Sequence, residues 1–472
     1  MYFWDPKFRA FRVTLSQLQN CFAGYFREIL SRSILIYFFS LYFVVADVQQ
    51  AFQGYDYVPA PIYFILIQLF QVLILVKLIP SRITGPVDVL QIFTAIFLTI
   101  PTLVTSFTNS ERIGYFESFG SSFAVLFNQF ILFWLGKFFL KTPPEFSEES
   151  KESRIDLPLI LIILLSTSAV IYILSSIQIN DFFGFEEVYE RRAEFMNMTS
   201  KPEALILGYA LGILGGTLVP LILIWGLLRK SYLLVVYSFL LAIVVYLGAA
   251  QKWVIGTNIL VLILFCIHRK NSSPATRSSS AFNGFSILIW VLIFLDPLFR
   301  SFRLVDLGIR RFLLDPSIML QYYVAFSKDY TFRYWQDLTP VQWLLNMSPS
   351  SDSPAIVIGE RYFHLPDRYF LLARSKMNAT GGAISDSIAQ AGILGLIITS
   401  CLLFFFFLFL GKLCTQIDSW LMFSVSALST YIICEGTFHT SIFSRGLIIV
   451  PVILFFHSRQ LYTSTKLRRL IE

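Results

Sequence analysis

The sequence predicts an all-α protein that crosses a membrane many times. Hydrophobic residues make up 56% of the 472 residues and charged residues only 14%, whereas a soluble protein carries about 25% charged residues. Apolar runs of about 20 residues recur along the chain, and an α-helix of that length spans a bilayer. Because no polar stretch is long enough to form a separate soluble domain, we expect one transmembrane bundle.

Twelve apolar segments are the expected transmembrane helices, and they make residues 34–457 a single bundle. Residues 1–33 carry Arg and Lys among apolar residues, which indicates either an amphipathic helix on the cytoplasmic membrane face or a loosely ordered tail. Residues 458–472 form a basic cytoplasmic tail. The twelve segments lie at about 34–52, 62–79, 87–107, 119–140, 157–179, 204–228, 231–249, 253–267, 284–302, 387–410, 419–435 and 441–457.

The distribution of basic residues predicts the orientation. Short loops on the side of the two termini hold pairs such as Arg229-Lys230 and Arg269-Lys270, whereas short loops on the other side hold few basic residues. The positive-inside rule therefore places both termini in the cytoplasm. It also accounts for the net charge of +7, so a nucleic-acid partner is not expected. The Ser-rich residues 271–283 are expected to be a flexible cytoplasmic linker.

Two external loops, about 180–203 and 303–386, are basic despite this rule. Long external segments are translocated whatever their charge, so the topology is unaffected, but the charge needs another explanation. In the second loop, residues 304–328 have apolar residues at helical spacing. Asp315-Pro316 interrupts the pattern, and proline suits the first turn of a new helix. Two short amphipathic helices on the outer membrane face are therefore expected.

Arginine in these external loops is suited to binding phosphate, because its planar guanidinium matches phosphate oxygens. Pre-placed cations would stabilise the negative charge that grows on a lipid diphosphate as a glycosyl bond to it breaks. Arg310 and Arg311 are adjacent in a helix, so at most one is expected to face a substrate. The alternatives are Glu–Arg pairing on a solvated helix and a lysine side chain extended to the headgroups. The candidates are Arg191, Arg192, Lys252, Arg303, Arg310, Arg311, Arg361, Arg368 and Arg374.

Two segments near the C-terminus add candidates for chemistry. Glu435 and His439 lie at the external end of the eleventh span, and either could remove a proton from an acceptor hydroxyl. Arg445 is placed just inside the twelfth span, where an arginine is a functional candidate by default. The alternative is a structural Glu435–Arg445 ion pair. Asp386, at the start of the tenth span, is either functional or a helix cap.

The stretch Asn378–Gly395, Asn-Ala-Thr-Gly-Gly-Ala-Ile-Ser-Asp-Ser-Ile-Ala-Gln-Ala-Gly-Ile-Leu-Gly, resembles the signature of the Wzy family of bacterial polymerases. Those enzymes join lipid-linked oligosaccharide repeat units. Glu435-Gly436 and Ser444-Arg445 resemble its enterobacterial common-antigen branch. In one respect the chain departs from the family, because no arginine has a glycine eleven positions on, as in the Arg-x10-Gly repeats of some members. The matching residues of the signature are Asn378, Thr380, Gly381, Asp386, Gly392, Ile393 and Gly395.

The resemblance implies a GT-C-like fold and a metal-independent glycosyltransferase of the bacterial inner membrane, with its site facing the periplasm. Donor and acceptor would be undecaprenyl-diphosphate-linked glycans, and undecaprenyl diphosphate would leave. A chain-length regulator is left open as a further partner, and no cofactor is expected. Glu435, His439 and Arg311 would serve catalysis. Substrate binding would fall to the other basic candidates with Asn378 and Arg445.

Two other functions fit the sequence less well. An O-antigen ligase would use the same donor with lipid A core as acceptor. A lipid-linked oligosaccharide flippase or other transporter would carry charges in mid-membrane helices and internal repeats. The cations here cluster outside the apolar segments and no repeat is evident, which favours an externally facing enzyme.

Overall fold

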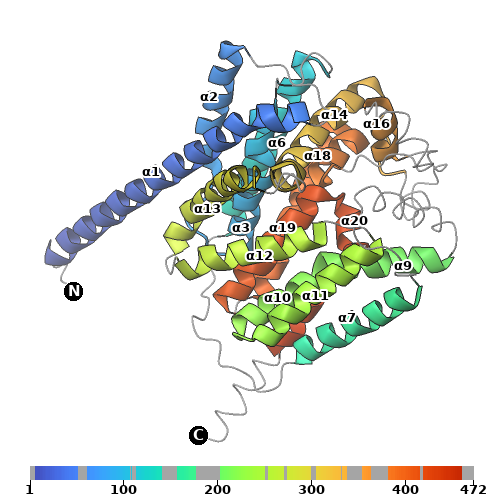
Figure 1. Cartoon of the computed structure of the whole chain (residues 1–472). Helices are drawn as coiled ribbons and strands as arrows, with labels where there is room; N and C mark the ends of the chain where they lie inside the picture. The colour runs from blue at the N-terminus through green and yellow to red at the C-terminus, as the bar shows by residue number, and fades with distance from the viewer. Residues whose placement is uncertain are drawn as a thin grey trace, which may run out of the picture.

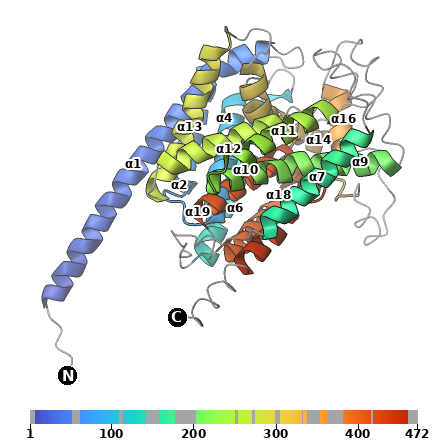
Figure 2. The same cartoon turned by 60° about the horizontal axis from the view of Figure 1, so that its bottom comes forward.

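A computed structural model describes most of the chain, and all regular structure in the described part is helical. The predicted all-α class is therefore confirmed there. The helices gather into one bundle, and the N-terminal part of α1 projects beyond it (Figures 1 and 2). The described residues are 6–51, 61–106, 108, 113–140, 157–176, 202–249, 253–270, 274–298, 305–330, 332–336, 353–362, 381–414 and 418–459.

The helices follow one another along the chain with short connections. A final helix, Ile449–Arg459, carries no label. The labelled elements are α1 (Pro6–Ala51), α2 (Ile62–Leu78), α3 (Pro86–Thr94), η1 (Ala95–Thr99), α4 (Ile100–Thr105), α6 (Tyr115–Phe139), α7 (Leu157–Ser176), α9 (Pro202–Ile213), η2 (Leu214–Leu218), α10 (Val219–Leu228), α11 (Tyr232–Ala249), α12 (Trp253–Lys270), α13 (Pro274–Leu295), η3 (Asp306–Leu314), α14 (Asp315–Asp329), α16 (Pro354–Tyr362), α18 (Ala383–Leu413), α19 (Ser419–Glu435) and α20 (Phe438–Ile442).

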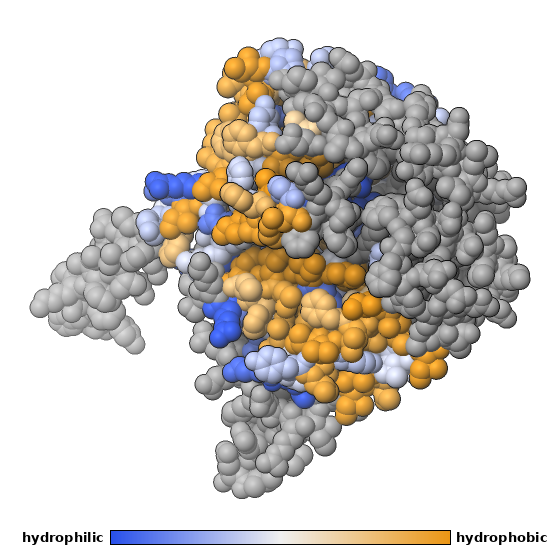
Figure 3. Space-filling view, viewed as in Figure 1, coloured by the Kyte–Doolittle hydropathy of each residue, from blue (hydrophilic) through white to orange (hydrophobic). Residues whose placement is uncertain are grey.

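Apolar helices of membrane-spanning length are the main feature of this bundle. Among the described residues, six helices are long and apolar enough to cross a membrane, and five more apolar helices are shorter. The coloured surface in Figure 3 is largely apolar, as expected of side chains that face lipid. These features support a helical membrane protein, while the number of twelve spans stays a prediction.

The centre of the bundle is formed by α19 and the continuous segment α3–η1–α4. Residues Pro86–Thr105 are almost wholly buried, and every residue of α19 from Trp420 to Cys434 is buried. Helix α19 packs on α3, and α18 packs on both α3 and α6. The C-terminal end of α19, where Glu435 lies, therefore has a fixed position relative to its neighbours.

Three π-helical segments, η1, η2 and η3, occur among the described residues. The predicted break at Asp315-Pro316 is wrong, because Asp315 has helical dihedral angles and η3 continues directly into α14. Proline has no N–H to donate, and the change from π to α bonding leaves a backbone group out of the pattern. The π segment thus accommodates Pro316 within one helix. Such segments are frequent at functional sites.

Helix α13 corrects the predicted linker at 271–283, because it begins at Pro274. The Ser-rich start is helical because it is packed against neighbours: Phe282 is fully buried, and its ring lies 6.1 Å from that of Tyr37 on α1. Helix α1 is also continuous across residue 33, so the basic N-terminal segment and the first predicted span form one helix. The Arg27 side chain donates to the Lys77 carbonyl at the end of α2, at 2.7 Å.

Helix α18 contains a break that the residue pattern did not predict. Ala391 and Gly392 have non-helical dihedral angles, and Gly392 has φ +59°. Two contacts with Gln390 hold the break in place: the Tyr334 N–H donates to its carbonyl at 2.8 Å, and the Trp335 N–H donates to its Oε1 at 2.7 Å. The helix begins at Ala383 rather than at 387, with Gly382 as its N-cap and Asp386 in its first turn.

The break predicts that Gly392→Ala destabilises the protein. A side chain at φ +59° is strained, and the added Cβ would lie 2.8 Å from Cζ of Phe332. We expect the free energy of unfolding in detergent to fall by about 1–3 kcal/mol. The control is Gly208→Ala in α9, where the Cβ meets nothing within 4 Å and alanine stabilises a helix by about 0.5–1 kcal/mol. Equal stability of the two variants would contradict the break.

Candidate functional site

The candidate site lies where α19 ends and the chain turns back. Glu435 is the last residue of α19, and Thr437 caps the short α20 with its hydroxyl. A turn follows before the final helix, because Gly446 has φ +75° and cannot continue a helix. The predicted continuous span at 441–457 is therefore wrong at its start. Arg445 lies in this turn rather than inside a membrane helix.

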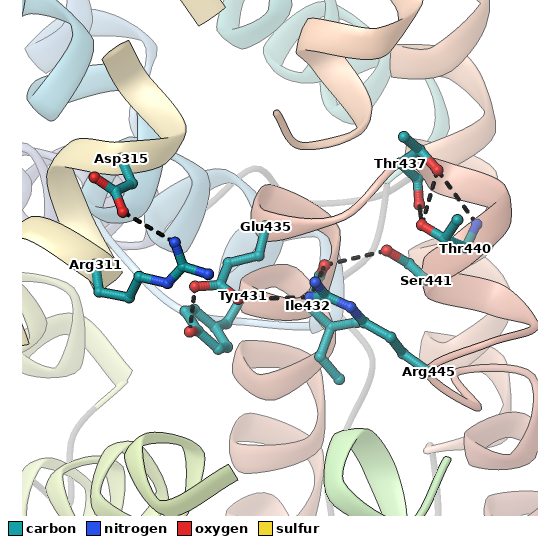
Figure 4. A network of polar contacts seen from close by, with 9 residues as sticks. All are labelled: Arg311, Asp315, Tyr431, Ile432, Glu435, Thr437, Thr440, Ser441 and Arg445. Carbon is teal, nitrogen blue, oxygen red and sulfur yellow. Dashed lines mark hydrogen bonds and ion pairs between the residues drawn. The ribbon is translucent and has the colours of Figure 1, made fainter. Parts of the chain in front are cut away.

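Glu435 makes contacts through both carboxylate oxygens (Figure 4). The Tyr431 hydroxyl donates to Oε1 at 2.5 Å, and Nη1 of Arg445 lies 3.6 Å from Oε2. Arg445 Nη1 also lies 3.4 Å from the Ile432 carbonyl, to which it donates. The side chains of Glu435 and Arg445 are only 12% and 19% exposed. The ion pair foreseen as the structural alternative is thus present, and it is mostly buried.

The turn that carries Arg445 is packed on η2 and the end of α9. The Thr217 hydroxyl of η2 donates to the Arg445 carbonyl at 2.6 Å. A Cβ at Gly212 would lie 2.3 Å from the Ser444 carbonyl oxygen, so only glycine permits this approach. These contacts hold the Arg445 backbone, and hence the origin of its side chain, in place.

Arg310 and Arg311 meet at one carboxylate. Nη1 of Arg311 lies 3.2 Å from Oδ2 of Asp315, and Nη1 of Arg310 lies 3.5 Å from the same oxygen. The expectation that adjacent arginines diverge assumed an α-helix, whereas i and i+5 become neighbours in a π-helix. Arg311 is 53% exposed and Arg310 is largely buried, so Arg311 is the one with a guanidinium open to the surroundings.

Tyr431 joins the Glu435 region to the arginine-bearing helix. Its ring stacks on Phe312 of η3 at 5.4 Å and lies edge-on to Phe97 of η1 at 5.2 Å. Figure 4 shows the Arg311 side chain extending toward Tyr431 and Glu435, and the charges of Arg311 and Arg445 both act on the Tyr431 hydroxyl. Each π-helical segment therefore contributes a contact to this site, η2 through Thr217.

The described part of the glycine motif borders the same site. A Cβ at Gly382 would lie 2.0 Å from the Cys434 carbonyl oxygen, so this glycine lets α18 begin against the last turn of α19. The Gly381 N–H lies 3.5 Å from the Tyr323 hydroxyl on α14, to which it donates. Because Cys434 precedes Glu435, the motif packs directly beside the carboxylate.

The remaining predicted site residues are not brought together by described contacts. His439 lies on α20, with the Thr437 hydroxyl 3.3 Å from its ring nitrogens. Arg361 lies near the end of α16, and its side chain is outside the described part. Outside it too are Arg191, Arg192, Lys252, Arg303, Arg368, Arg374 and Asn378, whose roles stay predictions.

The chain matches no protein-family model, no curated protein and no solved structure. The function therefore has to be argued from the geometry and chemistry of the site. The resemblance of the glycine motif to the Wzy family stays a prediction.

Sequence reasoning missed several residues of the site. Tyr431 lies four residues before Glu435, and Asp315 four after Arg311, so helical spacing could have indicated both pairs. The ion pair between Lys328 of α14 and the buried Glu117 of α6 had no such signal, because 211 residues separate its members. The hydrogen bond to Glu117 and its negative charge raise the pKa of Lys328 above its ordinary value.

The chemistry open to this site is that of charge stabilisation and proton transfer. Over the described ranges, no group of three His, Cys, Asp or Glu side chains is placed to hold a metal ion. The charged side chains near α19 are three arginines, Arg310, Arg311 and Arg445, and two carboxylates, Asp315 and Glu435. Arginine can bind an anion in two-pronged fashion, and a carboxylate can accept a proton.

The Glu435–Arg445 pair predicts strong coupling between Glu435→Gln and Arg445→Met. Each single variant leaves a mostly buried partner uncompensated, so the double variant should lose less stability than the sum of the two. We expect a coupling of about 1–3 kcal/mol in unfolding free energies measured in detergent.

The matched control is the exposed pair of Glu28 and Arg32 on α1, whose side chains are 58% and 73% exposed. Solvent screens this pair, so its coupling should be below about 0.5 kcal/mol. Additive losses at Glu435 and Arg445 would show that the two residues do not form a structural pair.

Proposed function

We propose that this protein is a membrane glycosyltransferase that polymerises undecaprenyl-diphosphate-linked oligosaccharide repeat units into a surface polysaccharide. The observation that supports it most is Glu435, a shielded carboxylate with the exposed Arg311 nearby and the Gly381-Gly382 motif beside it. A base and an anion-binding cation at one helix end are what a glycosyl transfer from a lipid diphosphate needs.

The proposed reaction is a single displacement at the anomeric carbon of the donor. A hydroxyl of the acceptor sugar attacks this carbon, and its proton passes to Glu435. The bond from the anomeric carbon to the diphosphate oxygen breaks, and the oxygen leaves with the electron pair. Arg311 stabilises the charge that grows on the leaving undecaprenyl diphosphate, and the basic candidates beyond the described residues add to this effect.

The proposal extends to topology and fold. Twelve spans in a GT-C-like arrangement would place both termini in the cytoplasm of a bacterium and the Glu435 end of α19 at the periplasmic side of the inner membrane. The excess of Lys and Arg in the loops that share a side with the termini supports this orientation.

The break in α18 favours one second candidate, a transporter of lipid-linked oligosaccharides. Interrupted helices line the substrate site in many transporters, and Ala391-Gly392 interrupts α18 beside a buried polar segment. The described site charges, however, lie at the end of α19 and on η3–α14 rather than midway along a span. An O-antigen ligase differs from the proposed polymerase only in its acceptor, so an assay that offers both acceptors distinguishes the two enzymes.

Arg311 provides the test of the proposed chemistry. With purified protein and lipid-linked repeat units, wild type should form polymer, and Arg311→Ala should lose about 1.5–3 kcal/mol of transition-state stabilisation, or roughly 10–100-fold in rate. Arg311→Lys should also be impaired, because lysine lacks the two-pronged guanidinium. Activity should persist in EDTA.

Arg32→Ala on α1 is the control, since Arg32 is exposed and pairs only locally with Glu28. Its rate should equal that of wild type. Polymer formation by Arg311→Ala at the wild-type rate would remove Arg311 from the site. Transfer to lipid A core alone would indicate a ligase, and movement of intact lipid-linked units without polymer would indicate a transporter.

The proposed topology predicts the labelling of single cysteines introduced into a cysteine-free variant of the chain. A membrane-impermeant thiol reagent applied to intact cells should label Tyr330→Cys and Ser350→Cys, because both are predicted to be external. Ala275→Cys should react only after the membrane is opened. Labelling of position 275 in intact cells would invert the proposed orientation.

A further inference from the structure

Tyr431 occupies a singular place in the site. It lies in the last turns of α19, four residues before Glu435, so the two side chains share one helix face. The tyrosine is fully buried, and its hydroxyl donates to Oε1 of Glu435 at 2.5 Å. A buried hydroxyl with one short bond to a carboxylate fixes the direction of that carboxylate.

The ring of Tyr431 cannot swing away from this position easily. Phe97 of η1 lies edge-on to it at 5.2 Å, and Phe312 of η3 stacks on it at 5.4 Å with 24° between the ring planes. Aromatic pairs of this geometry are favourable. Gly256 on α12 makes room for Phe312, since a Cβ there would lie 1.8 Å from Cζ of that ring.

The contacts of Glu435 leave its two oxygens with different tasks. Oε1 accepts the Tyr431 hydrogen bond, and Oε2 faces Arg445 at the longer distance of 3.6 Å. An ionised carboxylate only accepts, with about two lone-pair sites on each oxygen. The loosely held Oε2 is therefore the oxygen better placed to receive a proton from an acceptor hydroxyl.

The second contact of Tyr431 links this carboxylate to the anion-binding side. Phe312 follows Arg311 directly in η3, so the stacked ring sets the distance between the helix that carries Arg311 and the end of α19. Because a displacement of about 1 Å can cost two orders of magnitude in rate, this spacing matters for a reaction that uses both groups.

We propose that Tyr431 is a positioning residue, which orients the Glu435 carboxylate for proton transfer and sets its distance from Arg311. This inference rests on the proposed function. The competing explanation is that Tyr431 is a packing residue whose hydroxyl merely finds a convenient acceptor. The two explanations predict different kinetics for a variant that lacks only the hydroxyl.

Tyr431→Phe removes the hydroxyl and keeps the ring between Phe97 and Phe312. In the polymerisation assay we expect kcat to fall by roughly 10–100-fold, the range for one hydrogen bond to a charged group. KM for the lipid-linked substrate should stay unchanged, because the tyrosine does not bind substrate. In the Glu435→Gln background the same substitution should produce no further fall, because its effect acts through the carboxylate.

Tyr37→Phe is the matched control. Tyr37 is also fully buried, and its hydroxyl donates to the Ile96 carbonyl of η1 at 2.8 Å. Loss of this bond should leave kcat and KM at wild-type values. Wild-type kcat in Tyr431→Phe, or an equal fall in both tyrosine variants, would overturn the positioning role in favour of packing.

A second measurement keeps the inference testable if the protein does not polymerise glycans. The infrared difference between wild type and Glu435→Gln identifies the Glu435 carboxylate bands. These bands should shift in Tyr431→Phe and not in Tyr37→Phe, because only Tyr431 donates to this carboxylate. Absence of polymer from wild type would overturn the proposed function alone, whereas unshifted bands in Tyr431→Phe would overturn the orientation of Glu435 by this tyrosine.

Discussion

A carboxylate that is mostly buried at the end of an apolar helix must be paired, and the structure around α19 reflects that requirement. Glu435 receives a hydrogen bond from Tyr431 and an ion pair from Arg445. An unpaired charge in such surroundings costs several kcal/mol, so each partner has to be held where it can reach the carboxylate. The turn at Gly446 and the contact of Thr217 with the Arg445 backbone meet this need for the arginine.

Irregular backbone is how the chain brings these groups together. Each π-helical segment shifts the direction of the residues after it, and each contributes a side chain to the site: Phe97, Thr217 and Phe312. Glycine has a complementary use at Gly256 and Gly382, where any side chain would clash with a neighbouring ring or carbonyl. A regular α-helical bundle of the same composition could not bring three such segments to one helix end.

The sequence predicted the parts of this arrangement that depend on composition and short-range spacing. Apolar segments of bilayer length identified the helical membrane class, and Glu435 and Arg445 were recognised because charge is rare in such surroundings. The breaks were beyond it, because a π-helical segment such as η3 and the interruption at Gly392 depend on tertiary contacts. Tyr334 and Trp335 complete the interruption from more than fifty residues away, and no periodicity reports such a partner. The convergence of Arg310 and Arg311 on Asp315 was missed for the same reason, since it depends on the π geometry.

The interruption of α18 also separates two environments. Residues from Ala383 to Ala391 are all buried in protein, whereas Ile393 and Leu394, just beyond the break, are exposed on the apolar surface. A membrane helix adjusts its tilt when the bilayer thickens or thins. In α18 such an adjustment can be absorbed at Gly392, so the segment that packs beside Glu435 keeps its place while the lipid-facing segment moves with the membrane. The break thus acts as a mechanical isolator, which makes the geometry at the end of α19 independent of the bilayer in which the protein resides.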